Sequence, residues 1–136
     1  MGSDAVVVKQ AVKRLNAGGE TVGVLIVRLF RPFAIKDFIN SIPKSVTDIA
    51  VLDRCKLLNG IGEPLHMNTL NAFDKYQDNY CPTVLSGRYG LTSKSLSETM
   101  VIEVFEELKK KHPKKHFTLG IEADEKILST LYDEQL

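Results

Sequence analysis

The chain has 136 residues, of which 43% are hydrophobic, and this length and composition predict a single domain with a hydrophobic core. Its 18 lysines and arginines nearly balance its 17 aspartates and glutamates, so the net charge of +1 gives no overall attraction to nucleic acid or to a membrane surface. No apolar run approaches the ~20 residues needed to cross a bilayer. The N-terminus has the pattern of an amphipathic helix without a cleavage site, so we expect no signal peptide.

The cysteines and histidines indicate neither disulfide nor metal chemistry. Cys55 and Cys81 have neither the spacing of a redox pair nor that of a zinc knuckle, so we expect reduced thiols in the cytoplasm or an organelle. His66, His112 and His116 have no cysteine or carboxylate at ligand spacing. The sequence therefore predicts histidines at the surface or at helix ends.

The first half of the chain predicts a helix, a strand, a second helix and a second strand. Apolar residues recur at helical spacing over residues 7–15, and the Gly-Gly pair that follows can close this helix. Residues 22–29, VGVLIVRL, are apolar on both faces, as in a strand that is covered on both sides. A second helical stripe covers residues 34–42, and residues 48–53, DIAVLD, predict another buried strand.

The second half continues this alternation. Pro64 suits the first turn of a third helix, and residues 83–88, TVLSGR, predict a third strand. The capping box Ser95-x-x-Glu98 predicts the start of a fourth helix. Residues 116–121, HFTLGI, predict a fourth strand.

Alternation at this spacing predicts right-handed βαβ crossovers, and hence an α/β fold of three layers (αβα) with a mainly parallel sheet. We expect the tail from Asp124 to form one short helix, and residues 1–136 to form one domain. The chain begins with a helix where a doubly wound unit usually begins with a strand. Either Met1-Gly2-Ser3 is an expression tag, or the chain is cut just after its first strand.

Charged residues gather at the carboxyl ends of the predicted strands, where open α/β sheets bind ligands. Arginine suits bidentate contacts with carboxylates or phosphates, so this edge predicts either an anion or cofactor pocket or a surface that docks a neighbouring domain. Arginine is enriched at interfaces, and the adjacent phenylalanines favour docking. The residues of the edge are Arg28 and Arg31, then Asp53 and Arg54, then Arg88 and Tyr89.

No motif for nucleotide binding or catalysis is present in the sequence. NGIGEP, residues 59–64, lacks the G-x-G-x-x-G spacing, and there is no G-x-x-x-x-G-K-[ST]. No serine or cysteine nucleophile lies beside a histidine base, and no pair of carboxylates shares an obvious cleft. The residues thus predict a binding or structural role for the chain.

Five segments resemble one part of the pyruvate:ferredoxin oxidoreductases, in the same order and at similar spacing: VGVLIVRLFRPF, IPKSVTDIAVLDR, GEPL, SGRYGLTSK and HFTLGI. The resemblance runs from residue 1 to about residue 122, and GEPL and GRYGL are its more specific parts. The family consists of large enzymes with thiamine diphosphate and iron–sulfur clusters, which cleave pyruvate and transfer the acetyl group to coenzyme A. The Met-Gly-Ser start is also similar to the family, which favours a cut chain over a tag.

The resemblance implies the second domain of these enzymes, which is similar to the C-terminal domain of transketolases. Thiamine diphosphate, Mg and the 4Fe–4S clusters would be bound by other domains, so this fragment would hold no cofactor and be inactive alone. Its implied role is to dock the other domains of the same polypeptide through the arginine edge. The whole protein would be a homodimer in the cytoplasm or a mitochondrion-related organelle, and would pass electrons to ferredoxin, flavodoxin or a fused flavin reductase. No nucleic acid or membrane partner is implied.

Two stretches depart from the family pattern. Residues 55–60 stand where the family has a Thr-Lys-Glu-Pro-Gly-like run, and residues 74–82 also differ. These departures leave open a relative that is fused to an NADP-linked flavin reductase, or a scaffold domain of a sulfite reductase subunit. A module that binds coenzyme A or phosphate on the arginine edge is the remaining alternative.

Overall fold

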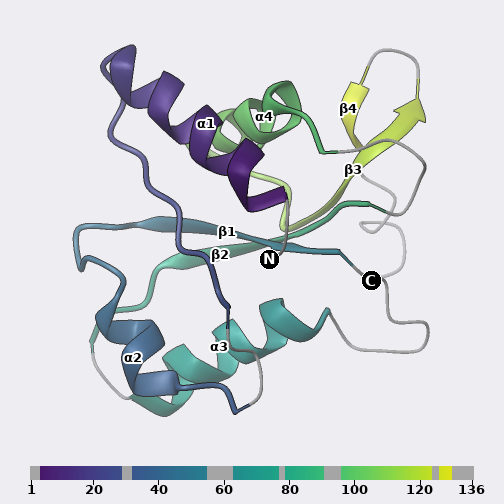
Figure 1. Ribbon diagram of the computed structural model, residues 1–136. Helices are drawn as coiled ribbons and strands as arrows, with labels where there is room; N and C mark the ends of the chain where they lie inside the picture. Colours follow the sequence, from purple (N-terminus) through teal and green to yellow (C-terminus); the bar gives the residue numbers. More distant parts are fainter. Residues whose placement is uncertain are drawn as a thin grey trace.

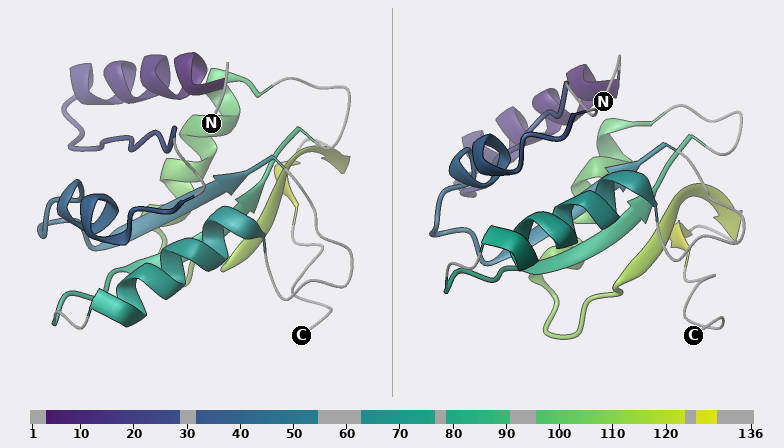
Figure 2. Two further views of the ribbon diagram at one scale, coloured as in Figure 1. Left: turned by 60° about the horizontal axis from the view of Figure 1, so that its bottom comes forward. Right: turned by 90° about the horizontal axis from the view of Figure 1, so that it is seen from below.

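A sheet between two layers of helices forms the centre of the computed structural model (Figure 1). The structure describes residues 4–28, 32–54, 63–76, 79–90, 96–123 and 126–129, with the backbone alone for 120–123 and 126–129. Helices α1 and α4 cover one face of the sheet and α2 and α3 cover the other (Figures 1 and 2). The predicted three-layer α/β fold is therefore confirmed.

The strand order within the described residues is β1-β2-β3-β4. The first three strands are parallel and β4 runs antiparallel to β3, which confirms a mainly parallel sheet. The helices are α1 (Ala5–Ala17), α2 (Ile35–Asn40), α3 (Pro64–Tyr76) and α4 (Glu98–Lys109). The strands are β1 (Asp48–Asp53), β2 (Thr83–Arg88), β3 (His116–Ala123) and β4 (Lys126–Ser129).

The hydrophobic core lies between the sheet and the α1–α4 layer, because the apolar faces of both helices meet the inner strands there. Its buried members include Ala11, Leu85, Val101, Val104, Phe117 and Leu119. Gly87 in β2 lies on the same face, since a Cβ atom at this position would lie 2.5 Å from Cε2 of Phe117 and 2.7 Å from Cδ2 of Leu52. The two side chains therefore fill the space above this glycine.

The start of α3 and the end of α1 follow the sequence signals, whereas α2 is shorter than predicted and α4 starts later. Pro64 is the first residue of α3, and the glycine pair closes α1, with Gly19 at a φ of 95°. The capping box predicted Ser95 as the N-cap of α4, but α4 begins at Glu98. Ser95 itself lies outside the described residues. Ser97 takes the capping role, because its hydroxyl accepts a hydrogen bond from the backbone N–H of Met100 at 3.2 Å.

The predicted strand at residues 22–29 is wrong. Residues 21–28 belong to no strand, and residue 29 lies outside the described residues. The run has the apolarity of a buried strand, but a strand also needs a neighbour that supplies a ladder of hydrogen bonds, and no described strand pairs with it. Val24 and Leu25 are consequently 39% and 43% exposed.

The helix predicted from Asp124 onward is also wrong for the described part of the tail. Residues 126–129 form β4, whose pairing with β3 sets Ser129 opposite Thr118. The edge of β3 supplies backbone partners that a four-residue helix would lack, so the short segment extends the sheet. Asp124 itself and residues 130–136 lie outside the described residues.

No helix within the described residues has the length and apolarity to cross a membrane.

Candidate functional site: the strand-end cluster

The register of the parallel strands brings charged and polar residues together at one end of the sheet. Asp53 of β1 pairs with Arg88 of β2, and Arg88 pairs with Thr118 of β3. Residues in register on parallel strands share a face, and α3, preceded by Glu63, packs against β1 and β2. We call Asp53, Glu63, His66, Ser86 and Arg88 the strand-end cluster; all five are buried.

Glu63 and Arg88 form the central ion pair of the strand-end cluster. The Nε of Arg88 contacts Oε1 of Glu63, and the side chains are only 10% and 4% exposed. The second carboxylate oxygen of Glu63 accepts a hydrogen bond from the hydroxyl of Ser86 at 3.3 Å. A buried charge needs a counter-charge, and Glu63 supplies one to Arg88 within the domain.

Asp53 caps helix α3 from the end of β1. Its Oδ1 accepts a hydrogen bond from the N–H of Leu65 at 2.9 Å, and its Oδ2 accepts one from the N–H of His66 at 3.1 Å. Burial raises the pKa of Asp53 above its usual value, although these two N–H groups act in the opposite direction. One carboxylate thus joins the strand to the positive end of the helix dipole.

His66 lies in the first turn of α3, at a helix end as predicted, but it is buried and not at the surface. Its side chain is 6% exposed and packs edge-on against His116, with ring centroids 5.8 Å apart. Burial and the charge of His116 lower the pKa of His66, against a smaller opposite effect of Glu63. The reason for the difference is the rotation of α3, which buries His66, Thr69 and Ala72 and leaves Leu70 40% exposed.

We expect acid to destabilise the protein through His66. The folded-state pKa lies below the ordinary value of 6.5, so the unfolded chain binds more protons once the pH falls below about 6.5. The contribution of neutral His66 to the free energy of unfolding is therefore fully present above that pH. It is lost on acidification, by at most ~1.4 kcal/mol per pH unit for this one group.

Urea unfolding at pH 7.5, 6.5 and 5.5 measures this dependence. His66→Gln should flatten it, whereas His112→Gln, at an exposed position, should leave it as in the wild type. An equal loss of stability in wild type and His66→Gln would contradict the role of His66.

The other residues predicted for this edge have separate environments. Tyr89 is 4% exposed and its N–H donates to the carbonyl of Asp53 at 3.0 Å, while burial raises the pKa of its phenol. Arg54 has a side chain that is 65% exposed, contacts Asp4 at 3.6 Å between Nη1 and Oδ2, and lies over Gly90. Arg28 is exposed and follows no strand, and Arg31 lies outside the described residues.

The structure therefore places Asp53, Arg54, Arg88 and Tyr89 at the ends of β1 and β2, pairs only Asp53 with Arg88 in register, and leaves Arg28 in a different segment. The members of the strand-end cluster that the sequence prediction missed are Glu63, His66 and Ser86. Ser86 carried a signal, because a hydroxyl inside an otherwise apolar strand needs a polar partner. Within the described part of the chain, no group of three or more His, Cys, Asp or Glu side chains is placed to hold a metal ion.

Comparison with known proteins places the chain in a family. It matches the family model described as pyruvate:ferredoxin oxidoreductase core domain II over residues 1–90. It is 47% identical over 133 residues to a putative pyruvate-flavodoxin oxidoreductase of Synechocystis sp., covering 98% of this chain and 11% of that protein.

Two further relatives also have the name pyruvate-flavodoxin oxidoreductase. The pyruvate-flavodoxin oxidoreductase of Rhodospirillum rubrum is 45% identical over 139 residues, or 98% of this chain and 12% of that protein. A probable pyruvate-flavodoxin oxidoreductase of Escherichia coli is 41% identical over 133 residues, which cover 95% of this chain and 11% of that protein. The chain spans about a tenth of the length of these relatives. The chain belongs to the pyruvate:ferredoxin oxidoreductase family and corresponds to its core domain II.

Proposed function

We propose that this chain is a non-catalytic docking domain of a pyruvate:ferredoxin oxidoreductase-type protein, and that it holds the cofactor-binding domains in place. The internal neutralisation of the strand-end cluster is the observation that supports this role. The charge of Arg88 is compensated by Glu63, and the carboxylate of Asp53 is bound by the start of α3, so both groups already have partners within the domain. Arg54 is an exposed arginine at the end of β1, where a partner carboxylate can reach it.

In the proposed whole protein, pyruvate loses CO₂ and two electrons, the acetyl group passes to coenzyme A, and the electrons pass to flavodoxin or ferredoxin. Thiamine diphosphate, Mg and the 4Fe–4S clusters belong to other domains in this proposal. The described residues of this chain do not fit these groups, because their buried carboxylates are occupied by protein donors and they contain no metal-holding group. A homodimer in the cytoplasm, or in a mitochondrion-related organelle, completes the proposal.

The alternatives have less support. Relatives matched over 91–98% of the chain carry the name pyruvate-flavodoxin oxidoreductase, which favours this function over a sulfite reductase scaffold or an NADP-linked fusion. A coenzyme A or phosphate site would need several free cations on one edge. Arg88 is already engaged by Glu63.

Truncation of Arg54 separates docking from ligand binding. Arg54→Ala should change the stability of the isolated chain by less than about 1 kcal/mol, because its ion pair with Asp4 is exposed. In the full-length protein the same change should cost about 2–5 kcal/mol, because a buried partner carboxylate would lose its counter-charge. Thermal unfolding of both forms measures the difference.

Arg14→Ala is the matched control, since Arg14 also forms an exposed ion pair, with Glu98, but lies away from the edge. Calorimetric titration of the isolated chain with coenzyme A at two salt concentrations tests the rival function. Micromolar binding that weakens with salt and is lost in Arg54→Ala would overturn the docking role.

A further inference from the structure

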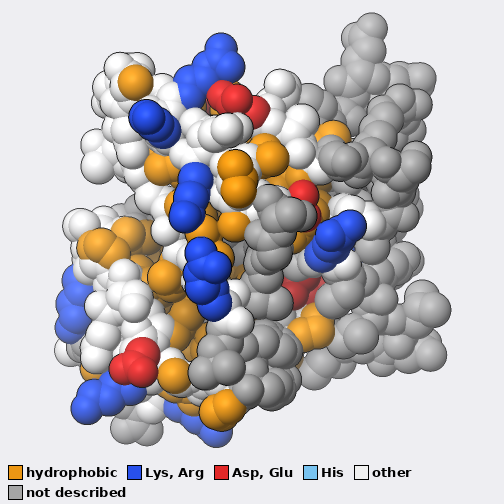
Figure 3. Space-filling view, in the orientation of Figure 1, with side chains coloured by type: hydrophobic (Ala, Val, Ile, Leu, Met, Phe, Trp, Pro, Cys, Tyr) orange, Lys and Arg blue, Asp and Glu red, His pale blue; other side chains and the backbone are white. Residues whose placement is uncertain are grey.

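A loop rich in lysine joins α4 to β3. Residues 110–115, Lys-Lys-His-Pro-Lys-Lys, contain four lysines and no acidic residue, and we call them the basic loop. The loop stands out from the body of the domain in the right-hand view of Figure 2. On the face shown in Figure 3, by contrast, lysines and arginines are interspersed with hydrophobic and acidic side chains. The basic loop therefore concentrates positive charge in a chain whose net charge is only +1.

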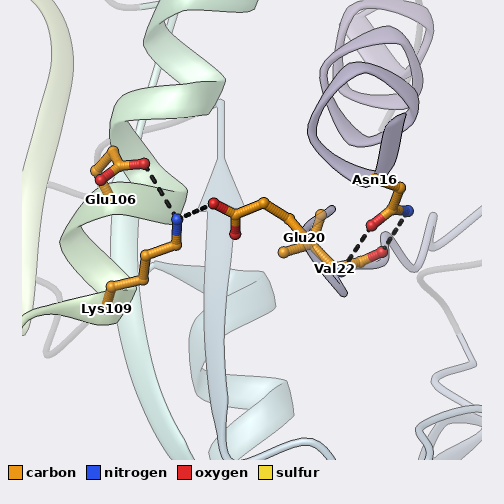
Figure 4. Close-up of polar contacts among 5 residues, drawn as sticks. All are labelled: Asn16, Glu20, Val22, Glu106 and Lys109. Carbon is orange, nitrogen blue, oxygen red and sulfur yellow. Dashed lines mark hydrogen bonds and ion pairs between the residues drawn. The ribbon is translucent and has the colours of Figure 1, made fainter. Parts of the chain in front are cut away.

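The lysines nearest the end of α4 have carboxylate partners. Lys109 contacts Glu20 and Glu106 (Figure 4). Lys110 pairs with Glu107 at 2.8 Å between Nζ and Oε2. Positive charge here also suits the negative end of the helix dipole. These two lysines thus have a role within the domain.

The other lysines of the basic loop have no such partners. Among the described residues, no carboxylate forms an ion pair with Lys111, Lys114 or Lys115. Helix α4 ends at Lys109, and the effect of a helix dipole falls off within the last turn, so the dipole does not account for them. Like charges this close in sequence repel one another, and an external anion would relieve that repulsion.

A buried carboxylate holds the basic loop in one shape. Glu107 is 1% exposed, and its Oε1 accepts a hydrogen bond from the N–H of Lys114 at 2.8 Å while its Oε2 accepts one from Lys110. Burial alone would raise the pKa of Glu107, but these hydrogen bonds lower it below its usual value, so the carboxylate stays charged. At the other end of the loop, the carbonyl of Lys115 accepts a hydrogen bond from the N–H of Ser86 at 2.7 Å. The lysines are therefore presented from a backbone that is fixed at both ends.

The composition of the basic loop indicates the kind of partner that it fits. Permanent interfaces have apolar cores from which lysine is depleted, and the loop has no exposed large hydrophobic residue. A single-stranded nucleic acid stacks its bases on aromatic side chains, and the loop has no Phe, Tyr or Trp. The exposed Glu106 on the adjacent turn of α4 would also repel a phosphate backbone that extends past the loop. A transient contact with carboxylates fits these features best.

We propose that the basic loop is a docking surface for an acidic protein, which binds transiently through carboxylates placed against Lys111, Lys114 and Lys115. Complementary charge of this kind speeds the encounter of two proteins and gives an affinity that falls with salt. The loop lies at the amino end of β3, whereas Arg54 follows the carboxyl end of β1. This inference therefore does not depend on the docking role of Arg54.

Binding of an acidic peptide to the 136-residue chain tests the surface. The probe is a fluorescein-labelled polyglutamate peptide, and its fluorescence anisotropy gives the Kd at low and at physiological salt. Replacing Lys111, Lys114 and Lys115 together by glutamine should raise the Kd by about tenfold at low salt, because three ion pairs of modest strength are lost together. Raising the salt should weaken binding to the wild type more than binding to this variant.

The matched control removes the same charge from other exposed positions. Lys9→Gln, Lys13→Gln and Lys36→Gln lie on α1 and α2, and together they should raise the Kd by less than about twofold, since exposed charges act mainly within a Debye length. Equal losses in the two triple variants would show that the peptide responds only to net charge, and would overturn the proposal. Tighter binding of an oligothymidylate strand, lost in the loop variant, would assign the loop to nucleic acid and would also contradict it.

Glu107→Gln tests whether the shape of the basic loop matters. The change removes a negative charge beside the loop, so charge alone would tighten binding of the peptide. It also weakens the charge-assisted hydrogen bond from Lys110, so a surface that depends on a fixed loop should bind less tightly, by about twofold or more. Tighter binding in a variant that remains folded by far-UV circular dichroism would show that Glu107 does not prepare the surface. The triple lysine variant changes no buried residue, so it tests the surface even if Glu107→Gln fails to fold.

Discussion

Replacing Glu63 by glutamine should lower the free energy of unfolding by about 3–5 kcal/mol. The change leaves the guanidinium of Arg88 in a site where the two side chains are only 10% and 4% exposed, without its counter-charge. It also weakens the acceptor that Ser86 uses at 3.3 Å. Urea unfolding at neutral pH, followed by far-UV circular dichroism, gives the difference directly.

A double variant distinguishes the effect of an unpaired buried charge from the effect of lost packing volume. Glu63→Leu with Arg88→Met should cost less than Glu63→Gln alone, because apolar side chains leave no buried charge behind. Arg14→Gln breaks an exposed pair with Glu98 and should cost less than about 1 kcal/mol. A loss below about 1 kcal/mol in Glu63→Gln would show that water reaches Arg88 and that the pair is not structural.

Adding a single methyl group at Gly87 should destabilise the protein by about 1–3 kcal/mol. The new Cβ of Gly87→Ala would lie 2.5 Å from the ring of Phe117 and 2.7 Å from the side chain of Leu52. Phe117 is buried to 1% exposure, so the ring cannot turn away into solvent and the strands must shift instead. Thermal and urea unfolding both report this loss.

Gly23→Ala is the matched control, because a Cβ at Gly23 meets no atom within 4 Å. It should be neutral or stabilising by about 0.4–1 kcal/mol, since alanine restricts the unfolded chain more than glycine does. Equal effects of the two substitutions would indicate that the packing around Gly87 is loose enough to absorb a methyl group.

Local sequence patterns were sufficient to predict many of the helices and strands. Residues 48–53 and 83–88 are strands at both predicted ends, because short apolar runs flanked by polar residues fix their own length. Pro64 likewise marked the first residue of α3. Residues 22–29 have an equally strong strand pattern, yet pairing depends on which neighbour the topology supplies, and that is not encoded in the run itself.

The part of the candidate site that lies on the strands could be predicted, because the ends of parallel strands meet at one edge of the sheet. That geometry correctly brought Asp53 of β1 beside Arg88 of β2. The partner of Arg88 could not be predicted, because Glu63 is 25 positions away and meets it only when α3 packs on the sheet. The burial of His66 depends on the rotation of α3 by a fraction of a turn, which several apolar stripes on that helix would allow.

The carboxylate of Asp53 has an evolutionary consequence for the peptide that joins β1 to α3. Because this side chain clamps the N–H groups of Leu65 and His66, the strand end and the helix start stay together whatever connects them. Doubling the length of a connection costs only ~0.6 kcal/mol in closure entropy. Substitutions and insertions in residues 55–62 can therefore accumulate without moving either element, and this is the natural place to insert an affinity tag or a fluorescent reporter.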